Sequence, residues 1–320
     1  MPTARRIAIV GATGAQGGGL ARAILASPAS DFTVRAITRD PTSLAARALA
    51  RDGAEVVTAD VDDTATFTDA LRGAHGAFLM TGYWSHLCPA TEKAQARCMA
   101  QAVSDAGVQH VIWSTLEDTR HYVPLDDPRM PTLLDRYKVP QFDAKGESDL
   151  AFTELGVPVT FLRTSFRWEN FITLGMGPRI GPDGTLVLAL PLGESRIAGI
   201  AAEDIGRCAL GIFAEGDRCL GQYVGVAGDH LTGAEMAAKI GRALGHTTLF
   251  RDIAADAFRR LRTPCSDELG NMLQFLRDFS DAVCACRSVE QSRVFNPSLL
   301  SFDDWLTSNV RRIPIDVITY

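Results

Sequence analysis

The sequence predicts an α/β fold in which a doubly wound parallel sheet is joined to a smaller, mostly helical C-terminal domain. Short β-branched runs alternate with helical patterns through the first half of the chain. The first run ends at a glycine-rich segment that opens a helix, and after residue 163 the alternation becomes irregular. Because crossovers between parallel strands are right-handed, we expect a ligand crevice outside the carboxyl ends of the strands.

The first half is expected to contain alternating strands and helices. Residues 6–10, Arg-Ile-Ala-Ile-Val, are rich in β-branched side chains and end at glycine, which is typical of a strand buried on both faces. Pro41 is placed to open the second helix, and Asp52-Gly53 marks the turn after it. In chain order, the expected elements are strand 6–10, helix 16–26, strand 32–38, helix 41–51, strand 55–59, helix 64–71, strand 76–81, helix 90–106, strand 108–115, helix 142–155 and strand 157–163.

The second half is patchier, and residues 175–184 are rich in glycine and proline. The expected elements are strand 185–190, helix 202–213, strand 222–226, helix 232–244 and further helices from residue 254 onward. We expect residues 1–164 to form a nucleotide-binding domain, with residues 196–226 rejoining it. Residues 165–195 and 227–320 would form a smaller domain that caps the crevice and binds a substrate or partner.

The composition is that of a globular protein. With 320 residues, of which 46% are hydrophobic, the chain can bury one or two cores. A net charge of -6 gives no basic field, which argues against direct binding to nucleic acid or to an anionic membrane. Residues 1–10 hold too few apolar residues for a signal peptide, and no apolar run approaches the roughly 18 residues that span a bilayer. We therefore expect a cytoplasmic location.

Cysteine usage agrees with a reducing compartment. The seven cysteines include no CxxC pair. Cys284-Ala-Cys286 could be a redox or metal element or could simply pack within a helix, but no cysteine or histidine cluster completes a metal site. No metal is expected.

The glycine-rich segment GATGAQG predicts a dinucleotide site of the Rossmann type, because it follows a strand and opens a helix. Its first two glycines allow a tight turn and a close approach of backbone N–H groups to a pyrophosphate, and its third permits close helix packing. The predicted cofactor-binding residues of this segment are Gly11, Thr13, Gly14, Ala15, Gln16 and Gly17.

The end of the second strand favours NADP(H) over NAD(H). An acidic residue there would accept hydrogen bonds from the ribose hydroxyls, but the strand ends in Thr38 and Arg39. A guanidinium can pair with a 2′-phosphate, and Thr38 can add a hydroxyl. The alternative is that Arg39 is a solvated surface charge and that Asp40 binds the ribose.

Two more loops belong to the same crevice by topology. After the third strand, Asp60 or Asp62 is placed to accept from the adenine amino group, while Val61 packs on the adenine face. Asp62 and Asp63 could equally cap the next helix. After the fourth strand, we expect a cofactor-binding loop formed by Thr81, Gly82 and Tyr83.

Taken together, these motifs resemble the NmrA-like family of atypical short-chain dehydrogenases, especially NADPH sensors of the HSCARG type. The matching segments cover nearly the full chain: GATGAQGG at 11–18, TR at 38–39, TGYW at 81–84, FDAKGE at 142–147, GVPVTFLR at 156–163 and WENF at 168–171. The resemblance implies an NADP(H) site lined by Gly11, Thr13, Gly14, Gln16, Arg39, Asp60, Thr81, Lys145 and Phe166. It also implies sensing of the NADPH/NADP balance or regulation of a protein partner, although some relatives are reductases.

Catalysis is less clearly marked than cofactor binding. Typical short-chain dehydrogenases protonate the substrate with a tyrosine four residues before a lysine, aided by a serine. Here Lys145 and Ser114 are present, but Gln141 replaces the tyrosine and cannot donate a proton. A displaced Tyr137 could serve if the fold brings it in. The other candidate acids are Tyr83, Tyr122, His110 and His121, whereas Lys145 could simply hold the nicotinamide ribose.

Two functions follow. The first is an NADPH/NADP sensor acting through a regulatory protein partner, with nucleotide binding ordering a mobile segment at residues 118–137. The second is an NADPH-dependent reductase of a carbonyl, quinone or imine, its small-molecule pocket roofed by Phe166, Trp168 and Phe171. Those aromatic residues could equally be core, and a homodimer is compatible with either function.

Overall fold

The computed structural model describes residues 4–27, 31–181, 183–261 and 264–315, and its central feature is a seven-stranded parallel sheet. The strand order is β11-β6-β5-β4-β1-β2-β3. The order reverses between β1 and β4, as in doubly wound folds. The strands are β1 (Arg5–Val10), β2 (Phe32–Thr38), β3 (Glu55–Thr58), β4 (Gly76–Leu79), β5 (His110–Thr115), β6 (Val159–Arg163) and β11 (Tyr223–Gly225). The predicted fold class is confirmed.

Helices cover both faces of this sheet. They are α1 (Ala15–Leu25), α2 (Leu44–Arg51), α3 (Thr64–Leu71), α5 (Pro89–Ala106), α6 (Pro140–Glu154) and α8 (Ala202–Glu215). One apolar core joins one face to α1, α2 and α8, and another joins the opposite face to α3, α5 and α6. Two glycines let α1 and α8 touch along their backbones, since a Cβ on Gly206 would lie 2.2 Å from the Gln16 carbonyl oxygen and one on Gly19 would lie 2.3 Å from that of Glu203.

Most helix and strand boundaries agree with those predicted from the sequence. Where the second helix begins at a different residue, its capping side chain explains the difference. The second helix begins at Leu44 rather than Pro41, because the Ser43 hydroxyl accepts the backbone N–H of Ala46. The helix at Thr64–Leu71 has the predicted bounds. Its cap is Asp63, whose carboxylate accepts the N–H groups of Ala65 and Thr66, so the capping interpretation is confirmed for Asp63.

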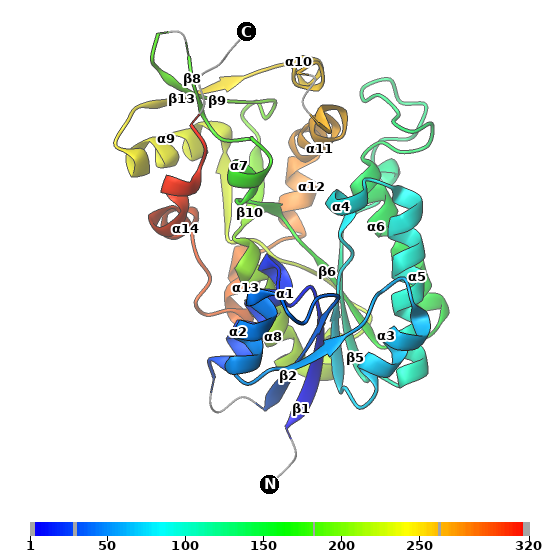
Figure 1. Ribbon diagram of the computed structural model, residues 1–320. Helices are drawn as coiled ribbons and strands as arrows, with labels where there is room; N and C mark the ends of the chain where they lie inside the picture. Colours follow the sequence, from blue (N-terminus) through cyan, green and yellow to red (C-terminus); the bar gives the residue numbers. More distant parts are fainter. Residues whose placement is uncertain (1–3, 28–30, 182, 262–263, 316–320) are drawn as a thin grey trace.

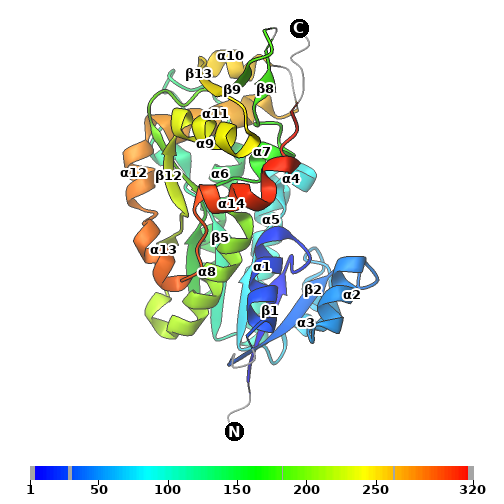
Figure 2. The same cartoon turned by 90° about the vertical axis from the view of Figure 1, so that its left-hand side faces the viewer.

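A smaller lobe stands above the carboxyl ends of the large sheet (Figures 1 and 2). It contains two three-stranded sheets, ordered β12-β10-β7 and β13-β9-β8. Its strands are β7 (Phe166–Arg167), β8 (Arg179–Ile180), β9 (Leu186–Leu190), β10 (Arg196–Ile200), β12 (Asp229–Thr232) and β13 (Thr248–Asp252). Its helices are α7 (Asn170–Thr173), α9 (Gly233–Leu244), α10 (Ala255–Arg259), α11 (Ser266–Asp278), α12 (Ser280–Ala285), α13 (Val289–Phe295) and α14 (Phe302–Asn309).

Helices dominate this lobe as expected, but the two small sheets were not predicted, because several of their strands are only two to five residues long. Of residues 196–226, α8 and β11 join the large sheet, whereas β10 pairs with β7 and β12. Aromatic side chains form the core of the lobe, and Trp168 and Phe171 both pack against Phe302. In the described part of the chain, no helix is long and apolar enough to cross a membrane.

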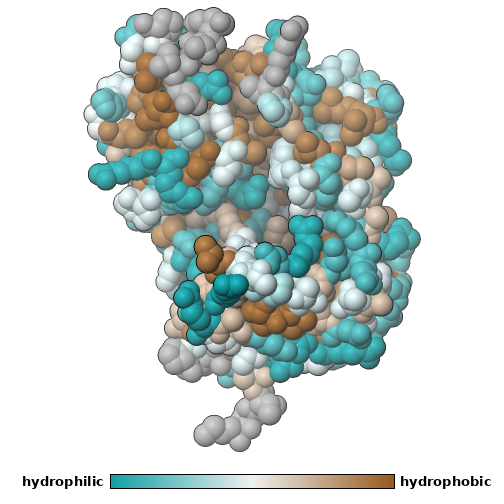
Figure 3. Space-filling view, in the orientation of Figure 1, coloured by the Kyte–Doolittle hydropathy of each residue, from teal (hydrophilic) through white to brown (hydrophobic). Residues whose placement is uncertain are grey.

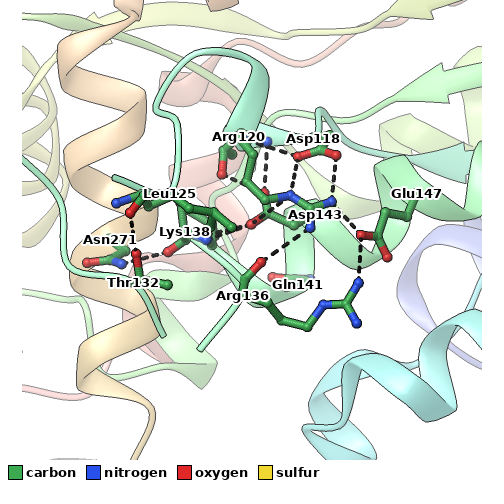
Figure 4. A network of polar contacts seen from close by, with 12 residues as sticks. Asp118, Arg120, Leu125, Thr132, Arg136, Lys138, Gln141, Asp143, Glu147 and Asn271 are labelled. Carbon is green, nitrogen blue, oxygen red and sulfur yellow. Dashed lines mark hydrogen bonds and ion pairs between the residues drawn. The ribbon is translucent and has the colours of Figure 1, made fainter. Parts of the chain in front are cut away.

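The segment 118–139 includes residues 118–137, which were expected to form a mobile loop, and it is joined by hydrogen bonds to α6 and α11 (Figure 4). The buried Asp143 carboxylate accepts the backbone N–H of Thr119 at 2.8 Å and that of Lys138 at 2.7 Å. The Lys138 ammonium donates to the carbonyl oxygens of Asp127 and Met130. From α11, the Asn271 amide donates to the Lys138 carbonyl oxygen at 2.6 Å. The segment therefore has a defined conformation between two helices.

Candidate functional site

Two adjoining cavities lie at the carboxyl ends of the large sheet, where the surface is hollowed between the lobes (Figure 3). The glycine-loop cavity, about 400 Å³, is lined by residues that include Gly11, Thr13, Thr38, Arg39 and Val61. The interlobe cavity, about 280 Å³, is lined from below by Gln16, Ser114, Thr115 and Lys145 and from above by residues of the smaller lobe. Met80, Thr81, Gly82 and Ser85 border both cavities.

The glycine loop has the geometry that the sequence predicts. Gly11 has a φ of +69°, a left-handed conformation that favours glycine, and its carbonyl oxygen accepts the N–H of Gly14 at 2.8 Å. A Cβ on Gly17 would lie 2.6 Å from the Gly11 carbonyl oxygen, so only glycine fits there. Gly14 caps α1, which begins at Ala15. The unpaired N–H groups of the first turn of α1 are therefore available to an anion.

Arg39 is exposed on the wall of the glycine-loop cavity. Within the described residues, its guanidinium makes no hydrogen bond or ion pair, so it is available to a ligand. Asp40 is committed instead, because its carboxylate accepts the backbone N–H of Thr42 at 2.8 Å and the Thr42 hydroxyl at 2.6 Å. These hydrogen bonds hold the pKa of Asp40 below its usual value. Asp40 lines the same cavity, but of the two side chains only that of Arg39 is without a partner in the described residues.

In the loop after β3, Val61 and Asp60 were both expected to border the adenine, but they lie in different surroundings. Val61 lines the glycine-loop cavity, but Asp60 does not, because its carboxylate accepts the backbone N–H of Asp62 at 3.1 Å within the turn. Gln95 of α5 lines the cavity as well, and its side-chain amide donates to Asp62 at 3.1 Å. No sequence pattern marks Gln95 as a cavity residue, since a single glutamine in a helix is usually solvated.

Lys145 lines the interlobe cavity and is held by a buried acidic partner. Its ammonium lies 2.7 Å from the Glu92 carboxylate and donates to the Thr81 hydroxyl at 2.6 Å. Glu92 is fully buried, and it also accepts from Thr81 and lies 3.2 Å from the His86 imidazole. An ammonium has three donors, so one remains for a ligand. This arrangement favours a ligand-holding role for Lys145.

Ser114, at the end of β5, lines the same cavity, and its hydroxyl donates to the side-chain oxygen of Gln16 at 3.1 Å. Gln141 also lines it, in the place where a proton-donating tyrosine would stand. The Gln141 backbone N–H donates to Glu268 of α11 at 2.7 Å. The lower wall therefore offers hydrogen bonds but no acid.

A second ionisable pair at the interlobe cavity is Tyr83 with Glu268. Of the tyrosines in the described residues, Tyr83 alone lines either cavity, and its hydroxyl donates to the Glu268 carboxylate at 3.0 Å. Burial raises the pKa of Glu268 to about 7 and also raises the pKa of Tyr83. The pair therefore holds a proton at the edge of the cavity near neutral pH. Glu268 was not among the residues selected from the sequence.

The other candidate acids lie elsewhere. Tyr137 is buried and lines neither cavity, because its ring is surrounded by the cations Lys93, Arg120 and Arg136. Tyr122 packs edge-on against Phe275 and Phe279. His110 is at the amino end of β5, far from the carboxyl ends that border the cavities, and its imidazole bonds to Thr160. His121 lies in the short 3₁₀ helix Thr119–His121 and lines neither cavity.

The upper wall is mainly apolar. Phe166 lines the cavity as predicted, but Trp168 and Phe171 do not, because they pack in the core of the smaller lobe. The remaining upper-wall residues are Arg167, Asn170, Leu174, Ala198, Met272, Leu276, Val283 and Arg287. Arg287 is fully paired: its guanidinium makes two 2.7 Å contacts with Glu117 and donates to the Thr164 carbonyl oxygen.

A doubly wound sheet with this glycine loop defines a Rossmann-type fold. The NmrA-like family model matches residues 3–306, and the chain belongs to the NmrA-like family. It is 33% identical over 239 residues to the NmrA-like family domain-containing oxidoreductase FrzB of Cladobotryum sp, covering 68% of this chain and 67% of that protein.

Solved structures share the fold. NmrA, a negative transcriptional regulator solved in complex with NADP, has a TM-score of 0.77 and 22% identity, over 97% of this chain and 96% of that one. The triphenylmethane reductase of Citrobacter sp., solved with NADP(H), has a TM-score of 0.74 and 17% identity, over 95% of this chain and 99% of that one. At these identities the similarity establishes the fold.

Proposed function

We propose that the protein is an NADPH-dependent oxidoreductase that reduces a small molecule in the interlobe cavity. The observation that carries this proposal is that the two cavities adjoin, since Met80, Thr81, Gly82 and Ser85 line both of them. A dinucleotide in the glycine-loop cavity would thus reach a mainly apolar chamber large enough for a small substrate. The name of FrzB and the reductase among the structural neighbours agree with this function.

The donors in the glycine-loop cavity suit NADP(H). The first turn of α1 would hold the pyrophosphate, and Arg39 the 2′-phosphate. The remaining donor of Lys145 would hold the nicotinamide ribose at the junction. When bound, NADPH supplies a hydride to an electrophilic carbon of the substrate.

The proton for a reduced carbonyl would come from Tyr83 rather than from position 141. The Tyr83 hydroxyl would pass its proton to the oxygen that gains negative charge, and protonated Glu268 would return one to Tyr83. Glu268 would then take a proton from water. Ser114 lines the same cavity and would orient the substrate oxygen by turning its one O–H from Gln16 to that oxygen.

The direct test has two stages. Equilibrium titration of the full-length protein should give tighter binding of NADPH than of NADH. Oxidation of NADPH, followed by its absorbance, is then measured over a panel of aldehydes, ketones, quinones and imines. Tight binding without turnover of any panel member would contradict the reductase proposal.

A second candidate is an NADPH/NADP sensor that acts through a protein partner. It is favoured by Gln141 in the place of the usual acid and by the contact of the segment 118–139 with α11, beside the cavity. Size-exclusion and pull-down experiments with NADPH and with NADP⁺ would test it. Identical oligomers and partners in both nucleotides would count against a sensor.

We also propose that the protein is cytoplasmic and does not bind nucleic acid directly. Its seven free cysteines agree with a reducing compartment.

A further inference from the structure

The upper wall of the interlobe cavity holds one guanidinium that the protein does not neutralise. Arg167 ends the short strand β7 and lines the cavity. Its side chain is partly buried, and within the described residues it has no hydrogen bond or ion pair. A buried cation is normally paired, because leaving water costs several kcal/mol that only a counter-charge or hydrogen bonds can offset.

Neighbouring charges explain why Arg167 has no internal partner. The nearest acidic residue along the chain is Glu169, but its carboxylate accepts the backbone N–H of Ala202 and the indole N–H of Trp305, both at 2.9 Å. The second arginine of this wall, Arg287, already occupies Glu117 through two 2.7 Å contacts. Glu169 therefore acts on Arg167 only through space, and neither of these two carboxylates makes a hydrogen bond or ion pair with it.

A second polar group of the same wall is also unpaired. Asn170 lies three residues further along, at the start of α7, and is only 5% exposed. It lines the interlobe cavity, and its side-chain oxygen is buried without a hydrogen-bond partner in the described part of the molecule. A buried amide without a partner costs free energy, so it too is set up for an occupant of the cavity.

Much of the upper wall around this pair is apolar. Its apolar residues include Leu174, Ala198, Met272, Leu276 and Val283. Burial lowers the pKa of Arg167, yet a guanidinium keeps its proton in proteins. Neither Arg167 nor Asn170 lines the glycine-loop cavity, so they do not belong to the part of the crevice that suits the dinucleotide phosphates.

We propose that Arg167 and Asn170 form a carboxylate-binding site, so that the substrate of the interlobe cavity is an apolar molecule carrying a carboxylate. The guanidinium fork matches the two carboxylate oxygens. The Asn170 side-chain NH2 group, which also has no hydrogen-bond partner in the described residues, would donate to the carboxylate, with the amide turned so that its NH2 group rather than its oxygen faces the ligand. A cationic iminium is disfavoured in this position by like charge. The inference rests on the proposed function in treating the ligand as a substrate, but carboxylate binding can be measured without turnover.

The test compares carboxylates with their neutral amides on the full-length protein saturated with NADP⁺. The probes are 2-naphthoate against 2-naphthamide and cinnamate against cinnamamide, each titrated calorimetrically. We expect at least one carboxylate to bind about tenfold or more tightly than its amide, the effect of a charge-assisted hydrogen bond. The absence of a preference in both pairs would overturn the inference.

Variants assign the preference to the two residues. Arg167→Met should abolish it while NADP⁺ affinity and the melting temperature stay unchanged, and Arg167→Lys should retain part of it. Asn170→Asp, which adds a negative charge beside Arg167, should weaken the carboxylate without affecting the amide. Arg293→Met removes an exposed arginine from α13 and serves as the matched control. A preference that survives Arg167→Met, or an equal loss of NADP⁺ binding, would contradict the assignment.

A kinetic measurement separates this inference from the proposed function. NADPH oxidation is compared for 4-carboxybenzaldehyde and methyl 4-formylbenzoate, which share the reducible group but differ in charge. Turnover of both at equal kcat/KM, with no binding preference, refutes the carboxylate site and leaves the reductase intact. A binding preference without any NADPH oxidation refutes the reductase and leaves the carboxylate site.

Discussion

The two cavities share a border but are built in different ways. The glycine-loop cavity is formed by backbone, small side chains and the exposed Arg39, all from the ends of neighbouring strands and helices of the large-sheet lobe. Two of the charges that line the interlobe cavity are held in buried pairs, Lys145 with Glu92 and Arg287 with Glu117, while Arg167 has no direct partner in the described residues. Bound phosphates need accessible hydrogen-bond donors, whereas a reaction on a small substrate needs charged groups that are held in place before the substrate binds. The proposed function therefore uses the glycine-loop cavity to bind the dinucleotide and the interlobe cavity to position the substrate.

The largest effect is expected from breaking the buried pair beneath the interlobe cavity. Glu92→Leu leaves the Lys145 ammonium and Thr81 without their acidic partner inside the protein. Removal of one member of a buried pair costs about 3–5 kcal/mol. Denaturant unfolding should show this loss. Glu215→Leu, which removes an exposed partner of Arg218, should barely change the midpoint and is the control. Equal stability of the two variants would contradict the preorganised pair.

The second largest effect is expected from removing the proposed proton donor, Tyr83. Tyr83→Phe removes the hydroxyl that lies 3.0 Å from Glu268, and we expect kcat for a carbonyl substrate to fall by about a hundredfold or more. NADPH affinity should not change. Since burial raises the pKa of Glu268 to about 7, the acid form is present below that pH, and kcat should decline as pH rises through it.

Glu268→Gln should remove this pH dependence, whereas Tyr137→Phe should leave the kcat profile unchanged because Tyr137 lines neither cavity. A Tyr83→Phe variant with wild-type kcat would exclude this proton route. A strong effect of Tyr137→Phe would instead favour the displaced tyrosine considered from the sequence.

The third effect tests the accessible cation of the glycine-loop cavity. Arg39→Asp replaces the guanidinium by a charge that repels the 2′-phosphate, so NADPH should bind about tenfold to a hundredfold more weakly. NADH affinity should stay level or rise. Arg47→Asp, an exposed change on α2 that does not line the cavity, is the control for net charge. An unaltered ratio of NADPH to NADH affinity would refute the phosphate role.

The same contrast explains what the sequence could predict. The glycine-loop cavity depends on local signals, since Gly11, Gly17 and Arg39 act through the backbone or the strand end at which they stand. The strands of the large sheet were predictable for the same reason, as short β-branched runs. The sequence left the role of Asp60 open, because a carboxylate after a strand can serve a ligand or its own turn, and in the structure it accepts the N–H of Asp62 within the turn.

The interlobe cavity depends on contacts between segments far apart in the chain, which local patterns do not show. The sequence did contain a signal for Glu92 and Glu268, the two carboxylates that hold the cavity-lining residues Lys145 and Tyr83. Glu92 precedes the buried Ala96 by four positions and Glu268 precedes the buried Met272 by four, so both carboxylates stand on apolar helix faces. A charged residue on such a face indicates a buried partner. For Arg287, which follows α12, no periodic pattern was available.

The smallest effect separates capping from ligand binding at the rim of the glycine-loop cavity. Asp63 caps α3 by accepting the N–H groups of Ala65 and Thr66 and does not line the cavity. Asp63→Ala should therefore lower the free energy of unfolding by about 1 kcal/mol and leave NADPH affinity unchanged. Asp63→Asn, which retains a capping oxygen, should recover most of the stability. If Asp63→Ala instead bound NADPH more weakly and kept full stability, the loop after β3 would contact the dinucleotide directly. Asp63 would then be a binding residue and not a helix cap.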